Sequence, residues 1–395
     1  MNRELIINKK IVGIYYWWYI TDDTYFTAGA GGTGRWIFEL SRVLMSRGYH
    51  VMLFAKYDDG DKENFHRHIG PYGIDIMSQE GFNAIREKQR FDYFINIGNL
   101  EMYNEYINCD KLYYMCHNNY VSLNRECDFD PHIQGKLVKF AVLSDDSKKR
   151  IIKEIPYQTT DKDFMLTTNG VDQSVYVSSQ YNESGCYNKK NKMVWSSNLD
   201  RGLLTFIRYA YPLIKKEIPD FELDICTYRV ATKEDIKKYV IDDDIHWLGS
   251  LSQSELAEKQ KESKVWCYPN LGITEEHYFF HETFCITAVE NALSKNAIIC
   301  LGNKDGIQTV FNGYDGFLDG NLFNENGVFY ISDFQNVGKA IAEMTIKAIK
   351  DDEYRQHLID QTYNMALKYT WEYAADSWIK EWGDEEYVAN YIANN

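Results

Sequence analysis

Short apolar runs alternate with amphipathic segments through the first 150 residues. Five runs have the length and the aromatic and β-branched content of buried strands. They cover residues 11–16, 50–55, 91–97, 111–116 and 137–143. Between the first two runs, Ile37, Leu40 and Val43 recur at helical spacing and Gly48 follows as a C-cap, which predicts a helix over residues 33–47. This rhythm is typical of a parallel α/β sheet.

A polar segment at residues 177–192, rich in Ser, Asn and Lys, interrupts the pattern and predicts a linker. The alternation then restarts, with strands expected at residues 193–196, 222–226, 245–248, 264–268 and 297–301. Helices are expected at residues 203–216, 233–239 and 253–263, and consecutive helices without a strand from Phe334 onward. We therefore predict two Rossmann-like, doubly wound α/β domains, at residues 1–176 and 193–370, followed by a helical segment at residues 371–395.

Length, charge and cysteine content narrow the class of protein. A chain of 395 residues with 45% apolar residues and six prolines is long enough for two globular domains. Its formal charge of −15, without a basic stripe, argues against a nucleic-acid partner. The eight cysteines lack the spacing of a zinc site, so we expect mostly reduced, buried thiols and no metal. The polar start and the lack of a long apolar window predict a cytoplasmic protein without a transmembrane segment.

Two acidic residues, Glu282 and Glu290, surround an expected helix start between two strands. If the helix begins near Thr283, Glu290 lies about two turns into it, roughly 12 Å along the axis. The backbone amides at the start then point into the crevice at the strand ends, where the helix dipole favours a phosphate. These amides belong to Phe284, Cys285 and Ile286. Carboxylates beside a phosphate suit hydroxyl groups, so the set fits a nucleotide diphosphate-sugar. The alternative is that Glu282 caps the helix and Glu290 is an exposed helical residue.

This segment resembles the E-x7-E signature of retaining GT-B glycosyltransferases, in particular family 4. Glu282, Phe284 and Glu290 occupy the matching positions, while Cys285 and Lys295 stand where glycine is common. Other stretches follow the family in order along the chain. They are a GG-x-x-R loop (Gly31, Gly32, Arg35), His117 after a strand, a helix start at Ser144, a turn at residues 167–176 and a phosphate-binding stretch at residues 194–203.

In the phosphate-binding stretch, Arg201 matches the lysine of the family, whereas Ser196 or Ser197 stands where an arginine is expected. The resemblance implies a GT-B fold, in which two Rossmann-like domains face one another across a cleft. The first domain would bind the acceptor and the second the nucleotide-sugar donor. The resemblance also implies that the helix at residues 371–395 returns to the first domain.

The activity implied by the resemblance is retaining, metal-independent transfer of a sugar, without a cofactor. The donor would be a UDP-sugar or a GDP-sugar, and the acceptor a hydroxyl of a glycan, a lipid or another molecule. Arg201 and the amides after Glu282 would stabilise the leaving diphosphate. Glu282 would position sugar hydroxyls, Glu290 would hold the ribose and His117 would contact the sugar. The glycines of the GG-x-x-R loop would let the backbone approach the diphosphate or the acceptor.

Two other functions fit parts of the sequence. Gly29, Gly31 and Gly34 form a G-x-G-x-x-G pattern, which suits a nucleotide-dependent oxidoreductase. A Rossmann fingerprint follows its strand immediately, whereas this run is separated from the first expected strand. The other alternative is a catalytically silent GT-B partner subunit, because of the missing arginine and the changes at Cys285 and Lys295.

Overall fold

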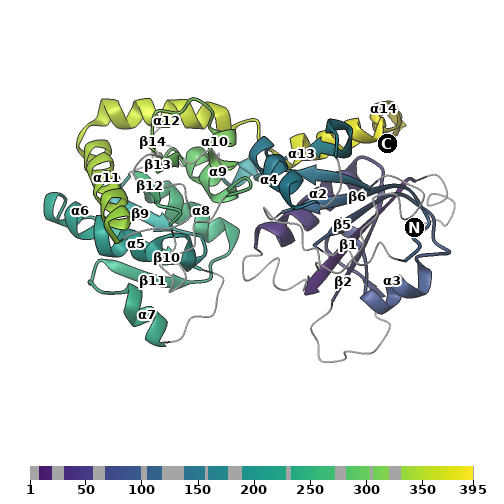
Figure 1. Ribbon diagram of the computed structural model, residues 1–395, viewed down its shortest axis with the longest axis horizontal. Helices are drawn as coiled ribbons and strands as arrows, with labels where there is room; N and C mark the ends of the chain where they lie inside the picture. The colour runs from purple at the N-terminus through teal and green to yellow at the C-terminus, as the bar shows by residue number, and fades with distance from the viewer. Residues whose placement is uncertain are drawn as a thin grey trace. The chain divides into compact units, whose positions relative to one another are not determined.

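The computed structural model divides the chain into two compact units (Figure 1). It describes residues 9–19, 31–56, 67–98, 105–117, 138–155, 159–176, 189–227, 233–271, 282–302, 306–319 and 331–394. Gly29 and most of the expected linker, residues 177–188, lie outside these ranges. Described residues up to Gly170 and from Trp371 onward form the N-terminal unit, and Val171–Thr370 form the C-terminal unit. Residues 171–176 are therefore part of the C-terminal unit, where the amide of Val171 donates to the carbonyl of Tyr369 (3.0 Å).

The N-terminal unit is built on one sheet, in the order β3-β4-β2-β1-β5-β6-β7-β8. Its strands are β1 (Ile11–Tyr19), β2 (His50–Lys56), β3 (Arg67–Ile69), β4 (Asp75–Met77), β5 (Phe91–Ile97), β6 (Cys109–Cys116), β7 (Val138–Val142) and β8 (Phe164–Leu166). All described pairings are parallel except that of β3 with β4. The five strands expected from the sequence are β1, β2, β5, β6 and β7. Strands β3, β4 and β8 have three residues each, too few for a periodic pattern to predict.

Helices of the N-terminal unit come from both ends of the chain. They are α2 (Gly32–Ser46), α3 (Gln79–Ile85), α4 (Asp145–Glu154), α13 (Trp371–Trp382) and α14 (Glu385–Asn394), the last two drawn in yellow in Figure 1. Helix α2 confirms the helix expected over residues 33–47 and buries Trp36 against Trp378 of α13 (ring centroids 6.0 Å apart). Ser144 caps α4 as expected, because its hydroxyl accepts a hydrogen bond from the amide of Ser147 (3.1 Å).

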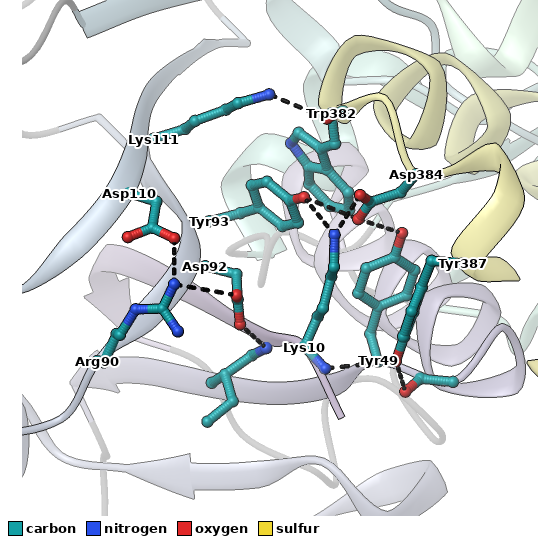
Figure 2. Close-up of polar contacts among 12 residues, drawn as sticks. Lys10, Tyr49, Arg90, Asp92, Tyr93, Asp110, Lys111, Trp382, Asp384 and Tyr387 are labelled. Atoms are coloured by element: carbon teal, nitrogen blue, oxygen red, sulfur yellow. Dashed lines mark hydrogen bonds and ion pairs between the residues drawn. The ribbon is translucent and has the colours of Figure 1, made fainter. Parts of the chain in front are cut away.

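A buried polar cluster holds the turn between α13 and α14 against the central strands (Figure 2). The carboxylate of Asp384 accepts hydrogen bonds from the hydroxyls of Tyr93 (2.7 Å) and Tyr49 (3.0 Å) and forms an ion pair with Lys10. The ring of Trp382 stacks on that of Tyr93 at 4.1 Å. Because Lys10 precedes β1 and Tyr93 lies on β5, the cluster fixes the C-terminal helices to the centre of this sheet.

The C-terminal unit contains two three-stranded parallel ladders, β11-β10-β9 and β12-β13-β14. The strands are β9 (Lys192–Trp195), β10 (Glu222–Cys226), β11 (Ile245–Gly249), β12 (Val265–Tyr268), β13 (Ala297–Gly302) and β14 (Phe317–Asp319). The ladders meet along β9 and β12, where the amide of Lys264 donates to the carbonyl of Lys192 (3.2 Å) and Lys190 bridges Ser263 in parallel. The resulting order, β11-β10-β9-β12-β13-β14, is that of a Rossmann sheet. The strands stay parallel, but the chain adds strands on one side of β9 up to β11 and then on the other side from β12 to β14, so the strand order reverses between β9 and β12.

Helices of the C-terminal unit are α5 (Leu203–Thr205), α6 (Tyr211–Glu217), α7 (Lys233–Tyr239), α8 (Gln253–Glu262), α9 (Ile286–Leu293), α10 (Gly306–Val310), α11 (Ile331–Lys350) and α12 (Asp352–Ala366). The helix expected over residues 203–216 is confirmed as an unbroken helical segment, in which a π-helical turn at Phe206–Ala210 lies between α5 and α6. Pro212 follows that turn and has no amide hydrogen with which to continue a regular helix. Within the described ranges, no helix has both the length and the apolar character needed to cross a bilayer.

Candidate functional site

The candidate site lies where strand order reverses in the C-terminal unit. Ser196 and Ser197 directly follow β9, and Tyr268 is the last residue of β12. In open α/β sheets, ligands bind outside the carboxyl ends of the strands at this reversal. The two serines, and the glutamates that follow β12, therefore belong to the part of the fold that favours a ligand.

Glu282 is held by a hydroxyl from the end of β12. The Tyr268 hydroxyl donates a 2.6 Å hydrogen bond to Oε1 of Glu282. Exclusion of water raises the pKa of the Glu282 carboxyl, while the Arg201 guanidinium and the Tyr268 hydrogen bond act in the opposite direction and the charge of Asp200 adds to the rise. Glu282 is thus a partly buried carboxyl whose charge depends on a nearby cation and a phenol.

Tyr268 itself has no exposed surface. Its ring stacks on Trp266 (4.9 Å between centroids, 14° between planes) and lies 5.6 Å from the ring of Trp195. Burial, followed by the charge of Glu282, raises the pKa of Tyr268 well above its ordinary value, so the hydroxyl stays protonated and remains a donor. The Ser197 hydroxyl lies 3.4 Å from the Tyr268 hydroxyl, which extends the contact back to β9.

Glu290 faces the interior of the C-terminal unit. The residue is 2% exposed, so the alternative of an exposed helical glutamate is wrong. Oε1 accepts a hydrogen bond from the side-chain amide of Gln253 (3.1 Å), and Oε2 lies 3.5 Å from that of Gln260. Gln253 also donates to the Tyr176 hydroxyl (2.7 Å), and Gln260 reaches the hydroxyl of Ser196 (3.4 Å). The two serines after β9 thus each connect to a different glutamate through one intervening side chain.

The helix that carries Glu290 begins later than the sequence suggests. Helix α9 starts at Ile286 and not near Thr283, because Cys285 adopts a left-handed conformation (φ 67°, ψ 78°) as its N-cap. Glu290 is therefore only about one turn, roughly 6 Å, into the helix, and the expected two turns are wrong. Of the three expected amides, that of Ile286 occupies the first helical position, where a helix supplies no acceptor. The amide of Phe284 lies in the loop before the helix.

Two non-glycine residues, one before α9 and one after it, adopt left-handed backbone conformations that usually favour glycine. Cys285 and Lys295, the two positions where the resemblance expects glycine, have φ of 67° and 56°. Phe284 anchors the loop, since it is buried with its ring edge-to-face against Tyr369 (5.1 Å). On the other side, the amide of Gly306 donates to the carbonyl of Glu282 (2.7 Å). A Cβ at Gly306 would fall 2.2 Å from the backbone of Thr283, so this close approach needs glycine.

Arg201 reaches the same region from the loop after β9. It ends a 3₁₀ turn (Leu199–Arg201), its side chain is 19% exposed, and its charge acts on the pKa of both Glu282 and Tyr268. The next residue, Gly202, has φ of 104°, and a Cβ there would lie 3.0 Å from the backbone of Leu271. This left-handed glycine lets the arginine turn pass close to the end of β12.

The remaining expected site residues belong to the N-terminal unit. Gly31 is the N-cap of α2 and Gly32 its first residue, and the amide of Arg35 donates to the Gly31 carbonyl (3.0 Å). His117 follows β6 and packs edge-to-face against Trp36 of α2 (5.1 Å). Burial lowers the pKa of His117 to about 3, so the imidazole is neutral near pH 7. Within this unit, the start of α2 and His117 are thus joined through Trp36.

Sequence reasoning missed four polar residues of the site. They are Tyr176, Gln253, Gln260 and Tyr268, each of which contacts one of the glutamates or a partner of one. Two signals point to them in retrospect. Gln253 and Gln260 are seven residues apart and so share one face of α8. Tyr268 carries a hydroxyl at the carboxyl end of a buried strand, which is the end at which open α/β sheets bind ligands.

No protein-family model and no curated protein sequence matches the chain. Solved structures do match it over nearly its full length. Sucrose-phosphate synthase from Thermosynechococcus elongatus has a TM-score of 0.68 and 14% identity, and the match covers 96% of this chain and 100% of that chain. The pneumococcal O-GlcNAc transferase GtfA, in complex with UDP and GlcNAc, has a TM-score of 0.62 and 11% identity over 97% of this chain and 99% of that chain. HepE from Anabaena, in complex with UDP-glucose, has a TM-score of 0.59 and 11% identity over 98% of this chain and 100% of that chain.

These similarities define the fold class. The chain has the GT-B fold of two Rossmann-like units, as the sequence predicts. At identities of 11–14% these similarities establish the fold and not the activity, which depends on the residues of the site.

Proposed function

We propose that the protein is a glycosyltransferase that moves a sugar from a nucleotide diphosphate-sugar to a hydroxyl of a glycan, a lipid or another acceptor. The observation that carries this proposal is the pair of glutamates beside the reversal of strand order in the C-terminal unit. Each carboxylate is fixed by a named donor, Tyr268 for Glu282 and Gln253 for Glu290. One cation, Arg201, acts on the first of them.

Arg201 and the start of α9 are proposed to bind the diphosphate. A guanidinium can make two parallel hydrogen bonds to phosphate oxygens, and the amide of Ile286 adds a donor at a helix N-terminus. As the bond to the sugar breaks, negative charge develops on the leaving diphosphate. These groups would stabilise that charge in a partly dehydrated site, which is where electrostatic stabilisation is strongest.

The two carboxylates are proposed to bind hydroxyls. Glu282 would accept hydrogen bonds from the transferred sugar, and Glu290 from the ribose. In the N-terminal unit, the neutral imidazole of His117 is proposed to contact the sugar as a hydrogen-bonding group. A group with a pKa of about 3 is a weak base near neutral pH, so the leaving phosphate is proposed to accept the acceptor proton. Retention of configuration and independence from metal ions are parts of the same proposal.

The nucleotide-dependent oxidoreductase is disfavoured by the position of the glycines. Strand β1 ends at Tyr19 and α2 begins at Gly32, so residues 20–31 separate them. A dinucleotide fingerprint needs its first glycine directly after the strand.

The test is donor binding followed by turnover. We expect UDP-glucose, UDP-N-acetylglucosamine or GDP-mannose to raise the melting temperature, because a ligand that binds only the folded state stabilises it. UDP donors come first because the structures of GtfA and HepE hold UDP and UDP-glucose. Release of the nucleoside diphosphate should fall about 100-fold or more in Glu282→Gln. The matched control is Glu343→Gln, which makes the same change on α11 at a side chain that is 67% exposed.

Three results would contradict parts of this proposal. Unchanged turnover in Glu282→Gln would remove Glu282 from the site. An inverted anomeric configuration in the product, read by NMR, would exclude retention. Loss of turnover after a chelator, restored by Mg²⁺ or Mn²⁺, would contradict independence from metal ions.

A silent partner subunit is the second candidate. It is favoured by Ser196 and Ser197, which bring no charge to the position where the resemblance expects an arginine. Donor binding by the wild-type protein without release of nucleoside diphosphate, across a panel of glycan and lipid acceptors, would support this candidate over the enzyme.

A further inference from the structure

A continuous line of hydroxyls leads from β9 to Glu282. The Ser197 hydroxyl lies 3.4 Å from the Tyr268 hydroxyl, which donates to Oε1 of Glu282 at 2.6 Å. A phenol has one hydrogen, and the shorter contact to a carboxylate receives it. The Tyr268 oxygen can then accept from Ser197. The direction of donation therefore runs from Ser197 through Tyr268 to Glu282.

The phenol that holds Glu282 has little freedom to move. Tyr268 has no exposed surface, and its ring is packed by Trp266 and Trp195. Glu282, in contrast, lies on the loop before α9 and not on a regular element. A carboxylate on a loop needs a rigid partner if it is to be held within a fraction of an ångström of a productive position.

We propose that Tyr268 is a positioning residue, which orients the Glu282 carboxylate toward the donor sugar through its hydrogen bond. This inference rests on the proposed function, since it assigns Glu282 the sugar hydroxyls. Tyr268 donates its single hydroxyl hydrogen to Glu282 and so occupies one acceptor position of that carboxylate. A carboxylate has about four such positions, so the hydrogen bond from Tyr268 does not by itself prevent it from accepting sugar hydroxyls.

The ring and the hydroxyl of Tyr268 do different things, and Tyr268→Phe separates them. Phenylalanine keeps the packing against both tryptophans and removes only the oxygen. A purely structural tyrosine would change the melting temperature and leave donor recognition alone. A positioning tyrosine would change the part of donor affinity that depends on the sugar.

The experiment compares UDP with UDP-glucose, and GDP with GDP-mannose, by calorimetric titration of wild type and Tyr268→Phe. For the pair that wild type binds, we expect the nucleoside diphosphate alone to bind both proteins equally. The additional affinity due to the sugar should fall about 10-fold in Tyr268→Phe, as expected for loss of a hydrogen bond to a charged group. Ser197→Ala should cause a smaller loss, because its contact with Tyr268 is longer.

A double-mutant cycle tests whether Tyr268 acts through Glu282. In a Glu282→Gln background, we expect Tyr268→Phe to cause no further loss of sugar-dependent affinity. An equal additional loss in that background would overturn the proposal, as would unchanged sugar-dependent affinity in the single variant. If wild type binds none of the four ligands, the proposed function fails together with this inference. If wild type binds a donor and Tyr268→Phe binds it equally well, only this inference fails.

Discussion

The side-chain nitrogen of Gln253 lies 3.1 Å from Oε1 of Glu290, which joins the first turn of α8 to the first turns of α9. The same nitrogen donates to the Tyr176 hydroxyl at 2.7 Å. Since Glu290 is 2% exposed, its oxygens depend on protein partners instead of bulk water. Gln253 therefore contributes to the stability of this corner of the unit and, with Gln260, to the direction of the carboxylate.

Gln253→Leu should destabilise the protein by about 1–3 kcal/mol, because a buried carboxylate loses one of its donors. If Glu290 holds the ribose, the variant should also lose preference for UDP over 2′-deoxy-UDP, measured by titration. The control is Gln356→Leu on α12, where the glutamine is exposed and bonds to Asp360 (2.7 Å). We expect that change to cost less than about 0.5 kcal/mol. A variant at Gln253 with unaltered stability would show that this hydrogen bond does not support Glu290.

Donor recognition should depend on pH through Glu282. Burial raises the pKa of this carboxyl above its ordinary value, against the opposing effects of Arg201 and Tyr268, while Asp200 adds to the rise. The ionised form accepts hydroxyls, so turnover should fall on the acid side at a pH above the range of an ordinary glutamate, about 4.3. A pH profile of kcat/KM measures the position of this limb. We expect Tyr268→Phe to move it to higher pH, since the hydrogen bond that favours ionisation is lost.

The raised pKa of Glu282 also affects how the stability of the protein depends on pH. The effect is opposite in sign to that of an ordinary salt-bridged acid, whose pKa is lowered in the folded state. A raised pKa means that the folded state binds more protons than the unfolded state near this pH. The free energy of unfolding should therefore fall as pH rises from the unfolded-state pKa through that of folded Glu282. Urea unfolding of wild type and Glu282→Gln across this range tests it. Parallel curves for the two proteins would contradict a raised pKa for Glu282.

The sequence predicts the alternation of strands and helices well because buried parallel strands and amphipathic helices leave strong patterns. It also places Glu282 and Glu290 on a loop and helix after β12, as the structure has them. The start of α9 could not be predicted, since it depends on a left-handed Cys285, a residue without the conformational freedom of glycine. The π-helical turn before Pro212 is similarly a local event inside an otherwise helical pattern.

The polar partners of the glutamates were harder to predict than the glutamates themselves. Glu282 lies 14 residues after Tyr268 in the chain, and Gln253 lies on α8 whereas Glu290 lies on α9, so the tertiary fold brings each pair together. A sequence pattern contains neither of these long-range contacts. The spacing of two acids can suggest a site, but the groups that orient them come from elsewhere in the fold.

The left-handed residues around α9 give a separate prediction. Cys285 (φ 67°) and Lys295 (φ 56°) carry a Cβ in a conformation that costs roughly 1–2 kcal/mol. Replacement by glycine relieves that cost but increases the freedom of the unfolded chain by a similar amount, about 0.5–1 kcal/mol. Cys285→Gly and Lys295→Gly should therefore be neutral or slightly stabilising in urea unfolding. Cys285→Val should lose about 1–3 kcal/mol, because a β-branched residue suits this conformation poorly. Equal stability of the Gly and Val variants at position 285 would contradict the left-handed N-cap.

The contacts of Asp384 predict how firmly the C-terminal helices are held (Figure 2). Its carboxylate is 3% exposed and accepts from Tyr93 and Tyr49 while paired with Lys10. In Asp384→Leu, three donors lose their acceptor, and a broken buried pair typically costs about 3–5 kcal/mol. Because Lys10 is 32% exposed and can be rehydrated, we expect the lower end of that range.

The places where Asp384→Leu loses protection from hydrogen exchange distinguish a local effect of this cluster from general destabilisation. Hydrogen exchange should accelerate in α13 and α14 and at the amino ends of β1 and β5, with little change in α8 and α9 of the C-terminal unit. Tyr387→Phe is the matched control, because the Tyr387 hydroxyl donates to the carbonyl of Gly48 (2.7 Å) next to the cluster without contacting a charged group in that bond. It should cost only about 1 kcal/mol. Two results would show that the C-terminal helices are held by their apolar packing and not by Asp384. One is faster exchange throughout both units in Asp384→Leu, and the other is a smaller loss of unfolding free energy in Asp384→Leu than in Tyr387→Phe.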